Sequence, residues 1–105
     1  MAESQIKVEG GDIFAGAKAV TSAGTAERLR ATTAVPKGFK SVLIRAKVAN
    51  TGKIYVGGSD VASSTNGGLD PGDSIIFSSK RLMLGAEFYV DSAENGEGVD
   101  YWLSR

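Results

Sequence analysis

The sequence predicts an all-β protein: a small antiparallel β-sandwich of about seven short strands, with a small barrel as the alternative. Fourteen of the 105 residues are glycine and only two are proline. Short runs of Val, Ile, Phe and Tyr lie between turn-forming segments, at spacings of about ten residues. A helical domain is disfavoured, because each interior glycine costs a helix about 1 kcal/mol relative to alanine.

The clearest strand is predicted from Lys40 to Val48, where the side chains alternate with period two. The side chains expected to face the core are those of Val42, Ile44, Ala46 and Val48. Those expected to face solvent are Ser41, Leu43, Arg45 and Lys47. Leu43 is the one imperfect position in this pattern.

A turn is predicted next, because Asn50 and Gly52 accept positive φ at low cost. The chain resumes as a second strand over residues 53–57. Because the two strands are joined by so short a turn, we expect them to form an antiparallel hairpin over residues 40–56.

Residues 57–72 are rich in Gly, Ser, Asn and Asp and are predicted to form a long loop. Val61 is its only sizeable apolar residue before Leu69, and we expect it to pin the loop to the edge of the core. Pro71 and Gly72 then predict a β-turn, because proline fixes φ at the first central position and glycine suits the second. A compact strand is predicted over residues 74–78.

Two further strands are predicted, over residues 86–90 and 98–103, joined by a turn as a closing hairpin. In the last strand Val99, Tyr101 and Leu103 share one face. Asp100 and Trp102 lie on the other face, which makes Trp102 a candidate contact residue.

The first third of the chain predicts strands less sharply. Residues 5–9 alternate, with Ile6 and Val8 inward; residues 12–21 are alanine-rich, and residues 26–31 suit a short strand or a helical turn. We expect strands here, within a single domain covering residues 1–105. Residues 1–21 are either an N-terminal arm or the first strands of the sandwich.

The absence of both histidine and cysteine removes most catalytic and metal chemistries. A Ser-His-Asp triad lacks its base, so the hydrolase-like Gly72-Asp73-Ser74 is attributed to a turn. Zinc sites of the usual kind lack ligands. The loop from Asp91 resembles a calcium loop only in part, since Trp102 stands where a glutamate is required. We therefore expect a non-enzymatic protein without a metal or cofactor. A small hydrolase or lyase that uses carboxylates is the one enzymatic hypothesis left.

Twelve basic and twelve acidic residues cancel, which argues against non-specific nucleic-acid binding but leaves room for a local basic patch. We expect no nucleic-acid partner. No apolar run approaches the roughly 20 residues that span a bilayer, so no membrane association is expected. Arg45 and Lys47 are expected to point outward together. They form either a solvated strand face or a docking patch for an acidic partner.

One ordered set of turns resembles a pattern found in small β-sandwich structural proteins of phage particles. An Asn-Thr-Gly turn (residues 50–52) leads into Tyr-Val-Gly (55–57), followed by a Leu-x-Pro-Gly turn (69–72). The segment from Phe88 to Tyr101 resembles the closing hairpin of such proteins. The resemblance covers about residues 40–103. It implies a virion component assembled in the host cytoplasm.

Within that class we expect a capsid decoration (cement) protein that binds the major capsid protein or other virion proteins and forms a homo-oligomer. A tail or baseplate component is one alternative. A carbohydrate- or receptor-binding module is another, suggested by Tyr101, Trp102 and the glycine-rich loop 57–68. Arg45, Lys47 and Trp102 are the predicted partner contacts; Asn50, Gly52, Pro71 and Gly72 are predicted structural turn residues.

Overall fold

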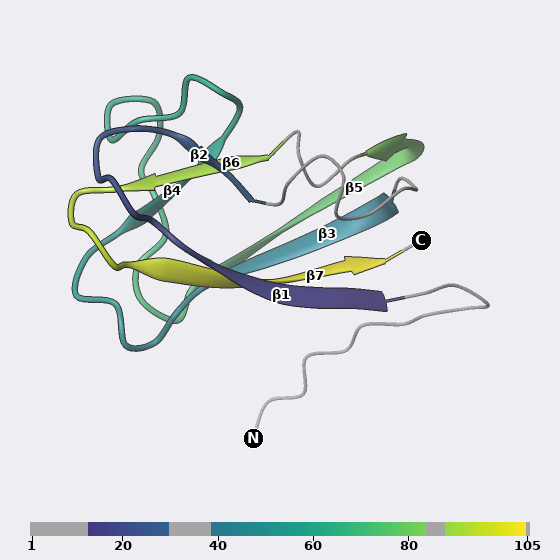
Figure 1. The fold of residues 1–105 in the computed structure, drawn as a ribbon. Helices are drawn as coiled ribbons and strands as arrows, with labels where there is room; N and C mark the ends of the chain where they lie inside the picture. The colour runs from purple at the N-terminus through teal and green to yellow at the C-terminus, as the bar shows by residue number, and fades with distance from the viewer. Residues whose placement is uncertain (1–12, 30–38, 84–87, 105) are drawn as a thin grey trace.

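The computed structural model describes residues 13–29, 39–83 and 88–104. These segments contain seven strands and no helix, arranged in two antiparallel sheets that do not close into a barrel (Figure 1). The predicted small β-sandwich is thus confirmed. Residues 5–9, where a strand was predicted, and part of the expected strand 86–90 lie outside the described residues.

The larger sheet has four strands in the order β1-β7-β3-β5. Its strands are β1 (Ile13–Ala19), β7 (Gly98–Ser104), β3 (Phe39–Ala46) and β5 (Ser74–Met83). The smaller sheet has three strands in the order β2-β6-β4. Its strands are β2 (Glu27–Arg28), β6 (Tyr89–Ser92) and β4 (Ile54–Gly57).

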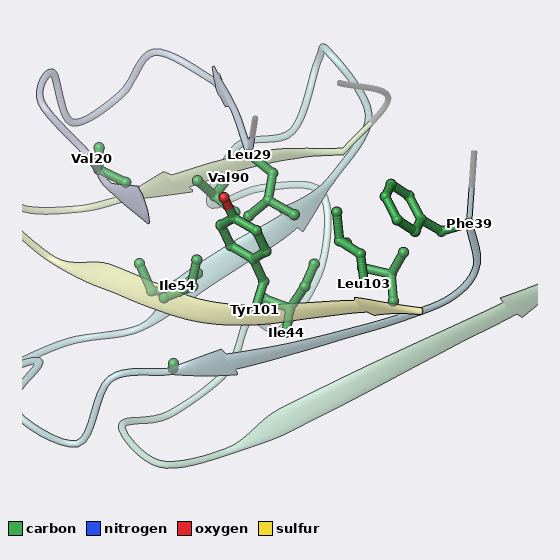
Figure 2. Packing of buried hydrophobic residues seen from close by; sticks show 11 residues of the cluster. Val20, Leu29, Phe39, Ile44, Ile54, Val90, Tyr101 and Leu103 are labelled. Carbon is green, nitrogen blue, oxygen red and sulfur yellow. The ribbon is translucent and has the colours of Figure 1, made fainter. Parts of the chain in front are cut away.

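A single apolar cluster lies between the two sheets (Figure 2). Its fully buried members include Phe39, Ile44 and Leu103 from the larger sheet and Ile54 and Val90 from the smaller one. Because both sheets supply side chains to the same cluster, neither sheet can bury its apolar face alone.

The alternation predicted for residues 40–48 and 98–103 is confirmed over the strands themselves. Along β3, Val42, Ile44 and Ala46 are fully buried. Val48 departs from the prediction, because it is 68% exposed. The strand ends at Ala46, and the N–H of Asn50 donates to the carbonyl of Lys47 (3.1 Å), so Val48 lies in a turn where the period-two rule no longer applies.

The predicted hairpin over residues 40–56 is wrong. Strands β3 and β4 belong to different sheets: β3 pairs with β5 and β7, whereas β4 pairs with β6. The connection between them crosses from one sheet to the other. The crossing buries Ile54 in the core from the side of the smaller sheet. Proximity along the chain does not decide between pairing within one sheet and crossing to the other.

The predicted closing hairpin is wrong for the same reason. Strand β6 lies in the smaller sheet, while β7 pairs with β1 and β3 in the larger sheet. Residues 93–97 therefore form a second crossing between the sheets, next to the crossing from β3 to β4. Both crossings lie at the same end of the sandwich (Figure 1).

The loop and turn predictions for residues 57–73 hold. Val61 is only 4% exposed and anchors the loop to the sandwich. Gly72 has a φ of 88°, a conformation that glycine adopts at low cost. It follows Pro71, as expected for the two central positions of a β-turn. The strand that follows is longer than predicted, since β5 runs over Ser74–Met83 and reaches a register opposite Phe39. In the first third, residues 13–19 form an edge strand of the larger sheet.

Candidate interaction surface

The outer face of the four-stranded sheet carries the side chains that alternate away from the core. Cross-strand register sets them in rows, and one row runs across all four strands. Trp102 of β7 is opposite Ala15 of β1 and Leu43 of β3, and Leu43 is in turn opposite Ile76 of β5. We call these four residues, Ala15, Trp102, Leu43 and Ile76, the apolar row.

The apolar row is open to solvent to different degrees along its length. Ile76 is 60% exposed. Ala15 is exposed as well, while Trp102 and Leu43, on the two central strands, are half-buried. None of the described strands lies over this face, because the smaller sheet packs against the opposite face through the shared core. A contiguous apolar strip in this position is a feature of interaction surfaces.

A charged row lies next to the apolar row. Asp100 is opposite Arg45 in the pairing of β7 with β3. Asp100 also accepts a hydrogen bond from the Nζ of Lys47 at 2.6 Å. The Lys47 and Asp100 side chains are 39% and 28% exposed, so solvent weakens this ion pair.

Arg45 is a half-buried charged residue on this face. Its Nε is buried and finds no acceptor among the described residues. A buried donor without an acceptor costs free energy, of the order of 1 to 3 kcal/mol. Because Nε itself is inaccessible, a carboxylate from a partner would bind the guanidinium through its two terminal amino groups.

The structure thus brings together all three predicted contact residues, Arg45, Lys47 and Trp102, on one face of one sheet. Sequence reasoning missed Ala15 and Ile76, which complete the apolar row. The sequence held one sign of this row, because Leu43 is an apolar residue at an outward-facing position of its strand. Only the strand order shows that Leu43 lies between Trp102 and Ile76.

The predicted turn residues hold the adjacent end of the sandwich together. Asn50 forms two hydrogen bonds with Gly98: its Nδ2 donates to the carbonyl oxygen (2.8 Å) and its Oδ1 accepts from the N–H (2.9 Å). The N–H of Gly52 donates to Oε1 of the buried Glu97 (2.8 Å). Pro71 and Gly72 form the exposed turn before β5. Asn50 and Gly52 therefore link the two sheet crossings instead of closing a hairpin.

The two buried carboxylates at this end of the sandwich, Glu97 and Asp91, accept hydrogen bonds from backbone N–H groups. Glu97 accepts from the N–H of Thr51 (2.7 Å) as well as from Gly52. Asp91, which sequence reasoning considered as a calcium ligand, accepts from the N–H groups of Gly24 and Ser92, both at 2.8 Å. Within the described ranges no three acidic side chains gather into a group that could hold a metal ion.

A second apolar feature lies where the two sheets diverge. A groove of about 310 Å³ runs between the inner face of β5 and the edge of β4. Its apolar walls are Val56, Leu69, Ile75 and Phe77, and residues 66–68 complete its lining.

These features define the chain as a two-sheet, all-β protein whose larger sheet carries an apolar row on the face away from the core. Comparison with protein-family models, with curated proteins and with solved structures gives no match to this chain. None of the described segments forms a helix long and apolar enough to cross a membrane.

Proposed function

We propose that this chain is a non-enzymatic structural protein of a phage particle, and specifically a capsid decoration protein that binds the shell through the outer face of its four-stranded sheet. The observation that carries the proposal is the apolar row beside Arg45, whose Nε has no acceptor among the described residues. The turn pattern over residues 40–103, which resembles that of small phage structural proteins, supplies the biological setting.

The chemistry of this face suits protein docking. Tryptophan and arginine are the residue types that most often dominate the energy of protein interfaces, particularly when they lie at the centre of the contact. Here Trp102 lies on a central strand, and Arg45 lies on the neighbouring strand one row away. Covering the row would remove Ile76 from water and would place partner atoms beside the guanidinium of Arg45.

The partner we propose is the major capsid protein, or another virion protein, with the complex assembled in the host cytoplasm. A tail or baseplate component would use the same surface, and the position of the chain on the particle separates the two. Neither role requires nucleic acid, a membrane or a cofactor.

A carbohydrate- or receptor-binding module is the second candidate, favoured by the half-buried Trp102 in the row next to Asp100. Sugar sites combine an aromatic face with free polar groups. On this sheet Asp100 is already bound to Lys47, and Trp102 has apolar neighbours on both sides. The surface therefore suits a protein partner better than a glycan.

The proposal is tested on the parent particle and with the purified chain. An electron-microscopy map should show the chain on the outer surface of the shell, with the four-stranded sheet towards the capsid. Purified protein should bind undecorated capsids. Trp102→Ala should weaken binding by about 2 kcal/mol, roughly thirtyfold, if Trp102 is central to the contact.

Charge reversal provides the matched comparison. Arg45→Glu should weaken capsid binding at least as much as Trp102→Ala, whereas Arg28→Glu, on the other sheet, should leave it unchanged. Thermal unfolding of each variant verifies that the fold is intact. Failure of the wild-type chain to bind capsids or virion proteins would overturn the proposal. Glycan-array binding that disappears in Trp102→Ala would favour the second candidate instead.

A further inference from the structure

Strand β5 is an edge strand of the larger sheet and the longest of the described strands. It runs over Ser74–Met83 and pairs with β3 on one side only. No described strand pairs with its other side. The edge of a sheet presents backbone N–H and C=O groups that can template pairing with another strand, and proteins usually protect such edges.

The protective features are missing from the first part of β5. Residues 74–79 read Ser-Ile-Ile-Phe-Ser-Ser and include no charge, proline or glycine. Ile75 and Ile76 are 37% and 60% exposed. An uncharged, β-branched edge of this kind is a site for strand addition, or for aggregation if nothing covers it.

The free edge of β4 shows the contrast, because the loop after it caps it. The N–H and carbonyl of Ile54 both bond to Leu69, at 3.0 and 2.7 Å. Nδ2 of Asn66 donates to the carbonyl of Val56 at 3.1 Å. The chain therefore protects one edge with its own loop and leaves the start of β5 for another strand.

The ladder with β3 shows which groups of β5 point to the free side. The N–H of Ala46 donates to the carbonyl of Asp73 at 2.8 Å. Hydrogen-bonded pairs recur every second residue in an antiparallel ladder, so Ile75 and Phe77 bond to β3. The N–H and C=O groups of Ser74, Ile76 and Ser78 then point away from β3, toward the free edge.

We propose that β5 pairs antiparallel with β5 of a second copy of this chain, about a two-fold axis that passes at Ile76. The two larger sheets then join into one continuous sheet. In this register Ile76 is opposite Ile76 of the second copy. Ile75 is opposite the second copy's Phe77, and Ser74 is opposite the second copy's Ser78. Such an isologous contact closes and does not propagate.

This register matches apolar residues on both faces of the joined sheet. On the outer face the apolar row of one copy ends at Ile76 and continues there into the row of the other. On the inner face Ile75 and Phe77 line the groove beside β4, and their copies lie next to it. Moving the axis to Ile75 or Phe77 would instead place Ile76 opposite a serine. The register at Ile76 therefore leaves the least apolar surface unmatched.

The pairing is independent of the proposed phage role, since it concerns only the free chain. Its test is the oligomeric state in solution, by sedimentation or light scattering across a dilution series. The wild-type chain should show the mass of two chains. Ile76→Lys places two like charges opposite each other and should give the mass of one chain. Val48→Lys, at an exposed apolar position in a turn, should remain a dimer.

Cross-linking tests the register directly, because the chain has no cysteine of its own. Residues that face each other in a hydrogen-bonded antiparallel pair have Cα atoms about 5.5 Å apart, within the range of a disulfide. Ile76→Cys should therefore oxidise to a covalent dimer, and Ala17→Cys, on the opposite edge strand, should not. A monomeric wild-type chain, a dimer that Ile76→Lys leaves intact, or equal cross-linking of both cysteine variants would each overturn the pairing.

Discussion

At the scale of the residue, Glu27 shows how a side chain near the surface can organise a loop. Its carboxylate forms an ion pair with Nζ of Lys18 at 2.9 Å. It also accepts hydrogen bonds from the N–H of Ser22 at 2.8 Å and from both the N–H and the hydroxyl of Thr21. The ionised Glu27 carboxylate therefore holds the turn after β1 in place through Thr21 and Ser22.

These contacts change the acidity of Glu27. Burial by itself raises the pKa of the carboxyl group, because it disfavours the charged form. The hydrogen bonds from Lys18, Ser22 and Thr21 act in the opposite direction and together outweigh burial, so the pKa falls from 4.5 to about 2. The folded state thus holds Glu27 ionised where the unfolded chain would protonate it.

We predict that Glu27→Gln destabilises the fold in a pH-dependent way. The folded pKa lies below the unfolded one, so the stabilisation is complete above pH 4.5 and disappears as the pH falls toward about 2. After allowance for solvent screening it amounts to about 1 to 2 kcal/mol. Urea unfolding at neutral pH and at several acidic values measures the difference between the two proteins.

The difference in the free energy of unfolding between wild type and Glu27→Gln should narrow as the pH falls from 4.5 toward about 2. Glu94→Gln, at an exposed position within the crossing from β6 to β7, serves as the control and should differ little from wild type at any pH. A Glu27→Gln effect of constant size across the pH range would contradict the assignment to the charge.

At the scale of the element, the pairing of β1 with β7 depends on a glycine. Gly16 is directly opposite Tyr101, whose ring is buried in the core. A Cβ on Gly16 would lie 2.5 Å from Cζ of that ring. The tyrosine side chain therefore occupies the space above its cross-strand neighbour, and the edge strand can lie flat against β7 only without a side chain there.

We predict that Gly16→Ala destabilises the protein by about 1 to 3 kcal/mol, as expected for overpacking. The sign is informative, because replacing glycine in a strand by alanine otherwise stabilises by restricting the unfolded chain. Thermal or urea unfolding measures the change. Gly67→Ala is the matched control: no atom lies within 4 Å of its added Cβ, so it should be neutral or slightly stabilising. Equal behaviour of the two variants would contradict this account.

The connections between elements are where local rules fail. Asn50 and Gly52 were identifiable as turn residues from their types alone. Their partners, Gly98 and Glu97, lie far along the chain. A turn of suitable composition is compatible with a hairpin and with a crossing, and the buried Glu97 carboxylate selects the crossing by binding the amides of the β3–β4 connection.

At the scale of the whole molecule, the two sheets depend on one core. Ile54 of the smaller sheet and Ile44 of the larger sheet are both fully buried in the same cluster. We therefore expect one cooperative unfolding transition. Trp102, the only tryptophan, lies on the larger sheet and reports on that sheet alone.

We predict that Ile54→Ala lowers the stability reported by Trp102 fluorescence by about 2 to 5 kcal/mol, although the substitution is in the other sheet. Far-UV circular dichroism should give the same midpoint as fluorescence for the wild-type chain and for the variant. If Ile54→Ala left the midpoint of the fluorescence transition unchanged, the larger sheet would fold independently of the shared core, and the expectation would be wrong.

The sequence by itself determined the all-β class, the inward and outward faces of β3 and β7, and the turn at Gly72. It also placed Arg45, Lys47 and Trp102 on outward faces. All of these follow from period-two alternation and from backbone preferences, which act between near neighbours. Only the tertiary structure decided strand order, and with it the two sheet crossings, the apolar row and the free edge of β5. Those depend on which strands pair across long stretches of chain, and pairing is selected by how the two sheets bury their apolar faces against each other.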